Sequence, residues 1–415
     1  MGHILQHEFD FESAEKAYDD HAKLMMVLGA LPSERLMRHL SNQRKGRRDK
    51  QYPLNNLWPC FVAMTVYNHD NFESFRRELG RNRDLRVACF GRNYKRDVPS
   101  ESAFSRFLKK LSAPESLEHL SEMFDEMTDE LRTLLPGFGE TMAGDSTDVA
   151  SLSNGNKDKV TGTMSDRDAS WRKYEHKFTD SEGNAHKSVK KWFGYKLHLL
   201  VDAKYELPTA FRVTGAKVND APALGKMLDN HLFTHPDMRP ESLALDGAYD
   251  DNDTHKNLWE REILPVIHKN KRVRKEAEGI FDMDGVPVCL IGCRMAYKGR
   301  DGEFTTYVCP DGKTVSCGEK CGTKVAKLKI GKDGDFVNYR ALPAHTDKFK
   351  REYKKRTSAE RVFSRLKDGF RLGRMNVMGL AKTTAMVGLS LLCMLGFALA
   401  WARLGAMEKI RAYAA

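Results

Sequence analysis

The apolar positions predict a helical part followed by a part in which strands and helices alternate. Up to about residue 135, apolar residues recur at helical spacing, as Phe72, Phe75 and Leu79 do. From about residue 139, short apolar runs bounded by turn residues take over. We expect strands at residues 141–151, 192–214, 242–249 and 263–268, the second range holding two strands joined by a turn, and helices at 223–233 and 253–262. This order predicts an α/β fold with a mixed sheet.

One predicted helix of the N-terminal part has a basic outer face. Ser100 is placed to cap a helix over residues 101–111, whose apolar residues fall on one side. The opposite side then carries Arg106, Lys109 and Lys110. Two short helices with such a face suit a helix-turn-helix-like reader of DNA. An ordinary amphipathic helix pair explains the same pattern, and the pattern alone does not separate the two.

The charge of the chain favours a polyanionic partner. It has 68 Lys and Arg against 57 Asp and Glu, a net charge of +11 and a pI near 9.1. Most of the excess lies between residues 348 and 374, which hold 11 basic and three acidic residues. An excess so concentrated indicates nucleic-acid contact there rather than a merely solvated surface.

A polar stripe lies within this basic segment. Tyr353, Arg356, Glu360 and Lys367 are spaced three, four and seven residues apart, so one α-helix would carry them on one side. Two earlier aspartates, Asp145 and Asp246, each end an apolar run. Carboxylates from separate elements hold pairs of Mg²⁺ or Mn²⁺ ions, which serve the attacking and leaving oxygens in phosphodiester cleavage. The three acids therefore predict a metal-dependent enzyme that acts on nucleic acid.

Each acid also has an ordinary explanation. Asp145 could be a turn or cap residue, with Asp148 as a rival ligand. Asp246 precedes a glycine, and Asp-Gly is a common turn. Glu360 lies three residues after Thr357, which is the spacing of a capping box. Taken together with the stripe and in this order, the acids favour catalysis.

The spacing Tyr-x2-Arg-x3-Glu-x6-Lys resembles the signature of the IS-four-type branch of bacterial DDE transposases. Asp145 in "AGDSTDVAS", Asp246 in "SLALDGAYDD" and Glu360 in "TSAERVFSRLK" stand in the order and setting that such transposases use. The phrases "FGYKLHLLVD" and "KVNDAPAL" are similar to the family as well. The resemblance extends from about residue 100 to the C-terminus.

The resemblance implies a ribonuclease-H-like mixed sheet with flanking helices and a β-rich insertion, preceded by an α-helical N-terminal DNA-binding domain. The corresponding ranges are 136–410 for the catalytic domain, 270–340 for the insertion within it and 1–135 for the N-terminal domain. It also implies that Asp145 bridges two Mg²⁺ or Mn²⁺ ions while Asp246 and Glu360 each hold one. Arg356, Lys367 and Tyr353 would then contact the DNA.

The implied activity is cleavage at the terminal inverted repeats of a mobile element and joining of the exposed 3′-OH to target DNA, by a homodimer on double-stranded DNA. A ribonuclease-H-like nuclease that does not join ends, and a domesticated DNA-binding protein without catalysis, are the alternatives.

The helix that carries Glu360 has apolar residues beside the stripe. Val362, Phe363 and Leu366 fall there and would seat the helix on the sheet. Arg361 and Arg365 fall on the far side, where we expect solvent or a second DNA segment.

Five cysteines lie in the expected insertion. Two Cys-x3-Cys units, with Cys309 between them, could form a structural zinc site from Cys289, Cys293, Cys317 and Cys321. Reduced structural thiols are the alternative, because the spacing is looser than in standard zinc ribbons.

The start of the chain lacks the basic and apolar regions of a secretory signal, so we expect a cytosolic protein. The resemblance implies that this is the bacterial cytoplasm and that the protein is associated with the nucleoid. Residues 385–402 form an uncharged run of 18. That run is long enough to reach across a bilayer, but a buried helix packed on the catalytic core is the preferred interpretation, with no membrane partner.

Overall fold

The computed structural model describes residues 20–44, 52–92, 97–158, 161–179, 185–270, 281–282, 285–289, 292–309 and 325–411. Before the first strand, the described residues are mainly helical: α2 (Asp20–Ala30), α3 (Glu34–Asn42), α5 (Leu54–Val66), α6 (Phe72–Arg81), α7 (Arg83–Phe90), α8 (Glu101–Leu111) and α9 (Pro114–Leu134). The two helices expected here are α6 and α8. Ser100 caps α8, since its hydroxyl accepts the Ala103 N–H at 3.3 Å.

A mixed sheet follows. Its strands are β1 (Thr141–Ala150), β2 (Ser170–Thr179), β3 (Ala185–Asp202), β4 (Leu207–Gly215), β5 (Ser242–Leu245) and β6 (Leu264–Ile267). β3 pairs antiparallel with β1, β2 and β4, while β1–β5 and β5–β6 are parallel pairs. The strands expected from the sequence are all present, and the mixed α/β class is confirmed. The pattern did not predict β2 or the long N-terminal half of β3.

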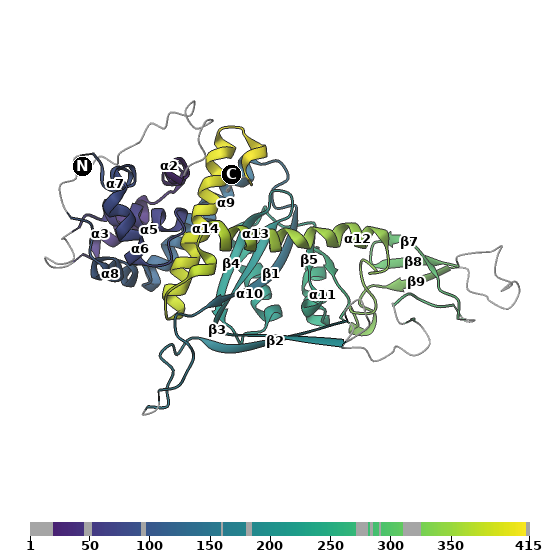
Figure 1. Cartoon of the computed structure of the whole chain (residues 1–415). Coiled ribbons are helices and arrows are strands. Elements are labelled where there is room, and N and C mark those ends of the chain that lie inside the picture. Colours follow the sequence, from purple (N-terminus) through teal and green to yellow (C-terminus); the bar gives the residue numbers. More distant parts are fainter. Residues whose placement is uncertain are drawn as a thin grey trace, which may run out of the picture.

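The parallel half of the sheet is short and apolar. Every residue of β5 is buried, as is typical of parallel strands that are covered on both faces. The connections contain α10 (Asp220–Thr234), the 3₁₀ turn η1 (Gly247–Tyr249) and α11 (Asn252–Glu260), and α10 and α11 are the helices expected at 223–233 and 253–262. Both helices lie beside the sheet in Figure 1.

The long apolar helix α14 (Leu380–Arg403) joins the two parts of the chain. It packs against α9, α2 and β4, and it stands between the N-terminal helices and the sheet (Figure 1). It is the one helix in the described residues that is long and apolar enough to cross a membrane, but 94% of its most apolar window is buried inside the protein. The preferred interpretation, a buried helix, is therefore confirmed. A further 3₁₀ turn, η5 (Met407–Lys409), follows it.

An almost continuous helical run crosses the sheet in Figure 1 and carries the polar stripe. It consists of α12 (Asp347–Tyr353), η3 (Lys354–Arg356) and α13 (Thr357–Gly369), and η4 (Leu372–Arg374) follows. Tyr353, Arg356 and Thr357 keep right-handed helical backbone angles across both junctions. Val362, Phe363 and Leu366 are buried and seat α13 on the sheet, as expected.

A separate antiparallel sheet lies at the end of the molecule beyond α12 (Figure 1). It is built from β7 (Ala296–Asp301), β8 (Phe304–Val308) and β9 (Val325–Lys329), and η2 (Lys332–Gly334) leads back to the core. Cys289, Met295 and Tyr307 form a small apolar core of its own. These strands fall within residues 270–340, the range in which we expect a β-rich insertion.

Candidate active site

Strand register brings the first two acids side by side. β1 and β5 pair in parallel, with Ala143 opposite Ala244. Two residues further along, Asp145 lies in β1 and Asp246 directly follows β5. Both acids therefore stand at the same level of two paired strands, and paired strands in a sheet lie about 4.8 Å apart. The 101 residues between them are therefore no obstacle to a common site.

The third acid approaches from above the sheet. Glu360 lies in the first turn of α13, which packs across β1 and β3. The pKa of Asp145 is raised to about 6, mainly by burial and also by the charges of Asp246 and Glu360, while the Ser146 N–H and Arg356 act in the opposite direction. The charges of both other acids therefore act on the Asp145 carboxyl group.

Arg356 lies between two of the acids. Its guanidinium group donates to Asp145 Oδ2 at 3.3 Å and to Glu360 Oε1 at 2.5 Å. The Arg356 and Asp145 side chains are each only 19% exposed, so their charges are weakly screened. The arginine Nε is buried and has no hydrogen-bond partner among the described residues. One guanidinium group thus contacts two acids, and its Nε–H is left as a further hydrogen-bond donor.

Asp246 combines its turn role with a place in the site. Its carboxylate accepts the Ala248 N–H at 2.8 Å and caps η1, so the ordinary turn interpretation holds. Burial is the main cause that raises its pKa, and the charge of Asp220 adds to this, whereas Ala248, Arg356 and His268 act in the opposite direction. Asp246 therefore belongs to the charge cluster as well.

The capping-box interpretation of Glu360 is wrong. The helical run does not begin at Thr357, because α12 and η3 lead directly into α13, and α13 has no side-chain cap. The Thr357 hydroxyl instead donates to the Lys354 carbonyl at 2.9 Å. Glu360 is bound by Arg356 one turn earlier, as two residues on the same side of a helix can be.

The outer members of the stripe flank the acids. The Tyr353 ring stacks on Phe349 and lies 5.3 Å from the His268 ring, while the Arg356 guanidinium carbon lies 5.8 Å from its centroid. Lys367, two turns beyond Glu360, lies 3.6 Å from Asp148. Asp148, the rival ligand, is thus occupied by a lysine of the stripe.

Sequence analysis did not identify Asp220 and Lys196 as site residues. Asp220, at the start of α10, accepts the Lys196 ammonium at 2.8 Å and the Ser146 hydroxyl at 2.9 Å. Lys196 is almost completely buried, and His198 beside it donates to or accepts from Thr214 at 2.9 Å. This network holds β1 and β3 to α10 next to Asp145. Asp220 lies in the phrase "KVNDAPAL", which was the one available signal.

Residues 140–395 match the family model described as a transposase DDE domain, which is more than half of the chain. The chain belongs to this family. One solved structure found by comparison is a chain from the cryo-EM structure of a piggyBac transposase synaptic complex with hairpin DNA, at 11% identity and a TM-score of 0.41, over 96% of this chain and 80% of that chain. No curated protein matches the chain.

DDE transposases generally use divalent metal ions, and the donor set of this transposase domain suits them. Asp145, Asp246 and Glu360 offer carboxylate oxygens, the ligands that Mg²⁺ and Mn²⁺ prefer. Within the described residues, no three His, Cys, Asp or Glu side chains are grouped closely enough to form a metal site. Arg356 lies between Asp145 and Glu360 and binds both.

The expectation that Arg361 and Arg365 face solvent or a second DNA segment is wrong for Arg365 and needs correction for Arg361. Arg365 is 8% exposed, and its guanidinium group donates to the Glu206 carbonyl. The Arg361 side chain stays half exposed, but its Nε donates to the Glu206 carboxylate at 2.6 Å. Glu206 lies between β3 and β4, so the far side of α13 is anchored to the sheet of the transposase domain.

The basic face of α8 is only partly available. Arg106 and Lys110 are half-buried, and Lys109 is exposed. The Lys110 ammonium donates to the Gln43 carbonyl at 3.0 Å, which ties α8 to the end of α3. DNA contact by these three residues stays a prediction.

The zinc expectation can be followed only in part. The Cys289 N–H donates to the Cys293 carbonyl at 2.9 Å, and the neighbouring residues Val288 and Arg294 form a β-bridge. Cys317 and Cys321 lie outside the described residues. Zinc at these four cysteines therefore stays a prediction.

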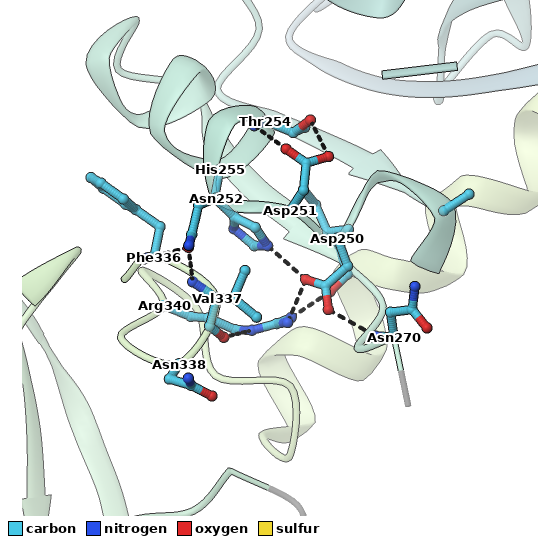
Figure 2. A network of polar contacts seen from close by, with 12 residues as sticks. Asp250, Asp251, Asn252, Thr254, His255, Asn270, Phe336, Val337, Asn338 and Arg340 are labelled. Carbon is cyan, nitrogen blue, oxygen red and sulfur yellow. Dashed lines mark hydrogen bonds and ion pairs between the residues drawn. The ribbon is translucent and has the colours of Figure 1, made fainter. Parts of the chain in front are cut away.

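A buried ion pair between Asp250 and Arg340 lies close in the chain to the second acid (Figure 2). Asp250, four residues after Asp246, accepts Arg340 at 2.5 Å, His255 at 2.9 Å and the Asn270 N–H at 2.7 Å. Arg340 also donates to the Ile267 carbonyl at 2.8 Å. The network joins the end of β6 to the segment that returns from the small sheet.

Proposed function

We propose that the chain is a DNA transposase that cleaves DNA at the terminal inverted repeats of its element and joins the exposed 3′-OH to target DNA. One observation supports the proposal most: Arg356 binds both Asp145 and Glu360, which come from separate elements, and the register of β1 and β5 brings Asp246 beside Asp145. A structural role alone does not require three acids at one place, because their mutual repulsion costs stability.

The acids and the stripe have complementary roles in this proposal. Asp145, Asp246 and Glu360 would hold two Mg²⁺ or Mn²⁺ ions, which supply charge stabilisation for the attacking and leaving oxygens. Arg356 would turn its free Nε and its terminal nitrogens to a phosphate, where the planar guanidinium gives two parallel hydrogen bonds. Tyr353 and Lys367, which precede and follow Arg356 in the stripe, would contact the DNA backbone and position it relative to the acids.

The strand order supports a ribonuclease-H-like fold. β4, β3 and β1 form an antiparallel series, and β5 and β6 extend it in parallel from β1. The first acid lies in the first strand, the second follows a parallel neighbour, and the third starts a helix across the sheet, which is the order that the resemblance implies. We place the protein in the IS-four-type branch on the Tyr-Arg-Glu-Lys spacing.

The N-terminal helices would bind the inverted repeats, and two copies of the protein would act on the two ends of the element. The protein would work in the bacterial cytoplasm, associated with the nucleoid.

The test is incubation of the purified protein with DNA that carries the repeats flanking its gene, with and without Mg²⁺ or Mn²⁺, next to the Glu360→Ala variant. Metal-dependent cleavage and joining by the wild type alone supports the proposal. Cleavage without a joined product indicates a plain nuclease, and binding without cleavage indicates a domesticated DNA-binding protein.

A further inference from the structure

A two-stranded ribbon projects from the sheet beside the candidate site. β3 is 18 residues long, but only residues 194–202 pair with β1. Residues 185–194 pair with β2 alone, along its whole length. In Figure 1 this ribbon runs along the lower side of the molecule and away from the core sheet. The ribbon, defined as residues 170–179 and 185–194, therefore has two open faces.

The surface of the ribbon combines basic and large apolar side chains. Its two strands hold six Lys and Arg residues and one acid, Glu175, while the connecting residues 180–184 lie outside the described residues and add two acids. Trp171, Tyr174 and Val189 are 43%, 58% and 44% exposed. A ribbon that only extends a sheet has no need for exposed rings of this size, whereas a surface that binds a partner does.

The register places like charges directly opposite one another. Lys173 faces Lys191. Opposed like charges destabilise a strand pair. Glu175 relieves part of this repulsion, since it pairs with Lys173 and with Lys187, the latter at 2.8 Å. Lys191 has no such acid opposite it, so the ribbon retains an unbalanced positive charge that an anionic partner would neutralise.

The ribbon is connected to the candidate site through one shared carboxylate. Lys190, at the base of the ribbon, lies 2.7 Å from Asp148, and Lys367 of the stripe lies 3.6 Å from the same oxygen. The basic surface of the ribbon thus continues into the basic side of α13. A polyanion bound near Lys367 would extend along the ribbon.

We propose that this ribbon binds double-stranded DNA next to the cleavage point. The face that carries Lys173, Lys187 and Lys191 would lie toward the DNA, with these lysines on phosphates and Trp171, which shares that face, against the groove wall. This proposal rests on the proposed function for the position of the cleavage point. A two-stranded ribbon fits the major groove of B-DNA, and phosphate contacts by Lys and Arg do not require a particular sequence. A second copy of this chain is the weaker occupant, because it would bring another net charge of +11.

The experiment measures DNA binding by the full chain as a function of salt, with a fluorescent duplex that carries the flanking repeat. The test variant changes Lys173, Lys187 and Lys191 to Thr, which keeps a high strand propensity. We expect the slope of log affinity against log salt to fall by roughly 2 to 3, because each lost phosphate contact removes about 0.9. At physiological salt the affinity should fall at least about tenfold.

A matched control removes the same charge from exposed lysines outside the ribbon: Lys226→Ala, Lys256→Ala and Lys329→Ala. We expect this control to keep the wild-type slope. Equal slopes for the ribbon variant and the wild type would overturn the proposal. So would unchanged DNA binding together with weaker self-association in sedimentation, because the ribbon would then meet a second copy.

A second measurement covers the case in which the triple variant does not fold. A benzophenone amino acid at position 189, which is exposed and on the same face as the three lysines, should cross-link to the duplex on irradiation of an otherwise unchanged chain. Cross-linking to protein alone would contradict the proposal. Both readouts need only binding, so a wild type that binds through the ribbon but neither cleaves nor joins would refute the transposase and leave the ribbon proposal standing.

Discussion

The Arg356 guanidinium donates a hydrogen bond to Asp145 at 3.3 Å, across 211 residues of chain. The same group holds Glu360 one helical turn further on, at 2.5 Å. One arginine thus contacts two of the three acids. Besides the DNA contact that we propose for it, the arginine of the stripe therefore links Asp145 to Glu360.

This relationship predicts opposite effects of Arg356→Ala on two ligands. Mn²⁺ binding without DNA should tighten several-fold, because a competing cation is removed. DNA binding should weaken, and its salt slope should fall by about 0.9 for one lost phosphate contact. Paramagnetic titration and fluorescence anisotropy measure the two, with Arg351→Ala, an exposed change on α12, as the control. Weaker Mn²⁺ binding with an unchanged salt slope would contradict the account.

Glu206 should be a strong anchor of α13. Its side chain is buried, and its carboxylate binds Arg361 at 2.6 Å, Arg365 at 3.4 Å and Arg411 at 3.3 Å. We expect Glu206→Gln to lower the free energy of unfolding by about 3 kcal/mol, since it leaves buried arginine charge without its partner. Chemical denaturation is the measurement.

Glu262→Gln is the matched control. Like Glu206, Glu262 has a positive φ, but its side chain is exposed and pairs with one arginine. It should change the free energy of unfolding by less than about 1 kcal/mol. A similar loss in both variants would show that the three arginines do not depend on Glu206.

The buried pair of Asp250 and Arg340 predicts a requirement for arginine geometry. Arg340→Lys keeps the charge but cannot reach Asp250 and the Val337 and Ile267 carbonyls at once. We expect a loss of about 2 to 3 kcal/mol of unfolding free energy and faster proteolysis of residues 271–335. Proteolysis at the wild-type rate would show that the pair does not hold the small sheet to the core.

The burial of His231 predicts that the folded protein loses stability in acid, independently of the candidate active site. Its pKa is lowered to about 4, mainly by burial and also by the charge of His235, while hydrogen bonds to the Met238 and Thr209 backbone and the charge of Asp125 act in the opposite direction. The unfolded state therefore binds more protons between pH 6.5 and 4, and stability falls as the pH falls through that window. The full effect is on the order of 3 kcal/mol. His231→Gln should flatten the pH dependence of unfolding, and parallel curves for the two proteins would contradict this.

The sequence predicted those elements whose burial depends on their own pattern. The apolar runs that became β1, β5 and β6 and the buried face of α13 followed from periodicity, and so did the position of Glu360 one turn after Arg356. β2 was missed, because it pairs with the projecting half of β3 and has few apolar residues to mark it.

Contacts between distant segments could not be predicted in the same way. A helical wheel shows that Arg365 lies opposite the stripe, but it cannot show that Glu206 comes from the β3–β4 turn to meet it. Likewise, Arg340 has no local pattern that marks it as the partner of Asp250. Both networks depend on the closed fold.

The most direct test of the central claim is a strand-transfer assay with each acid changed to its amide in turn. Asp145→Asn, Asp246→Asn and Glu360→Gln keep the size of the side chain but remove a metal-binding charge, and Asp253→Asn, an exposed change on α11, is the control. The joined product is quantified by sequencing of the DNA junctions. We expect it to disappear in all three variants and to persist in the control, with binding of the repeat DNA largely intact. Joined product at the wild-type level in any of the three would remove that acid from the site and contradict the account.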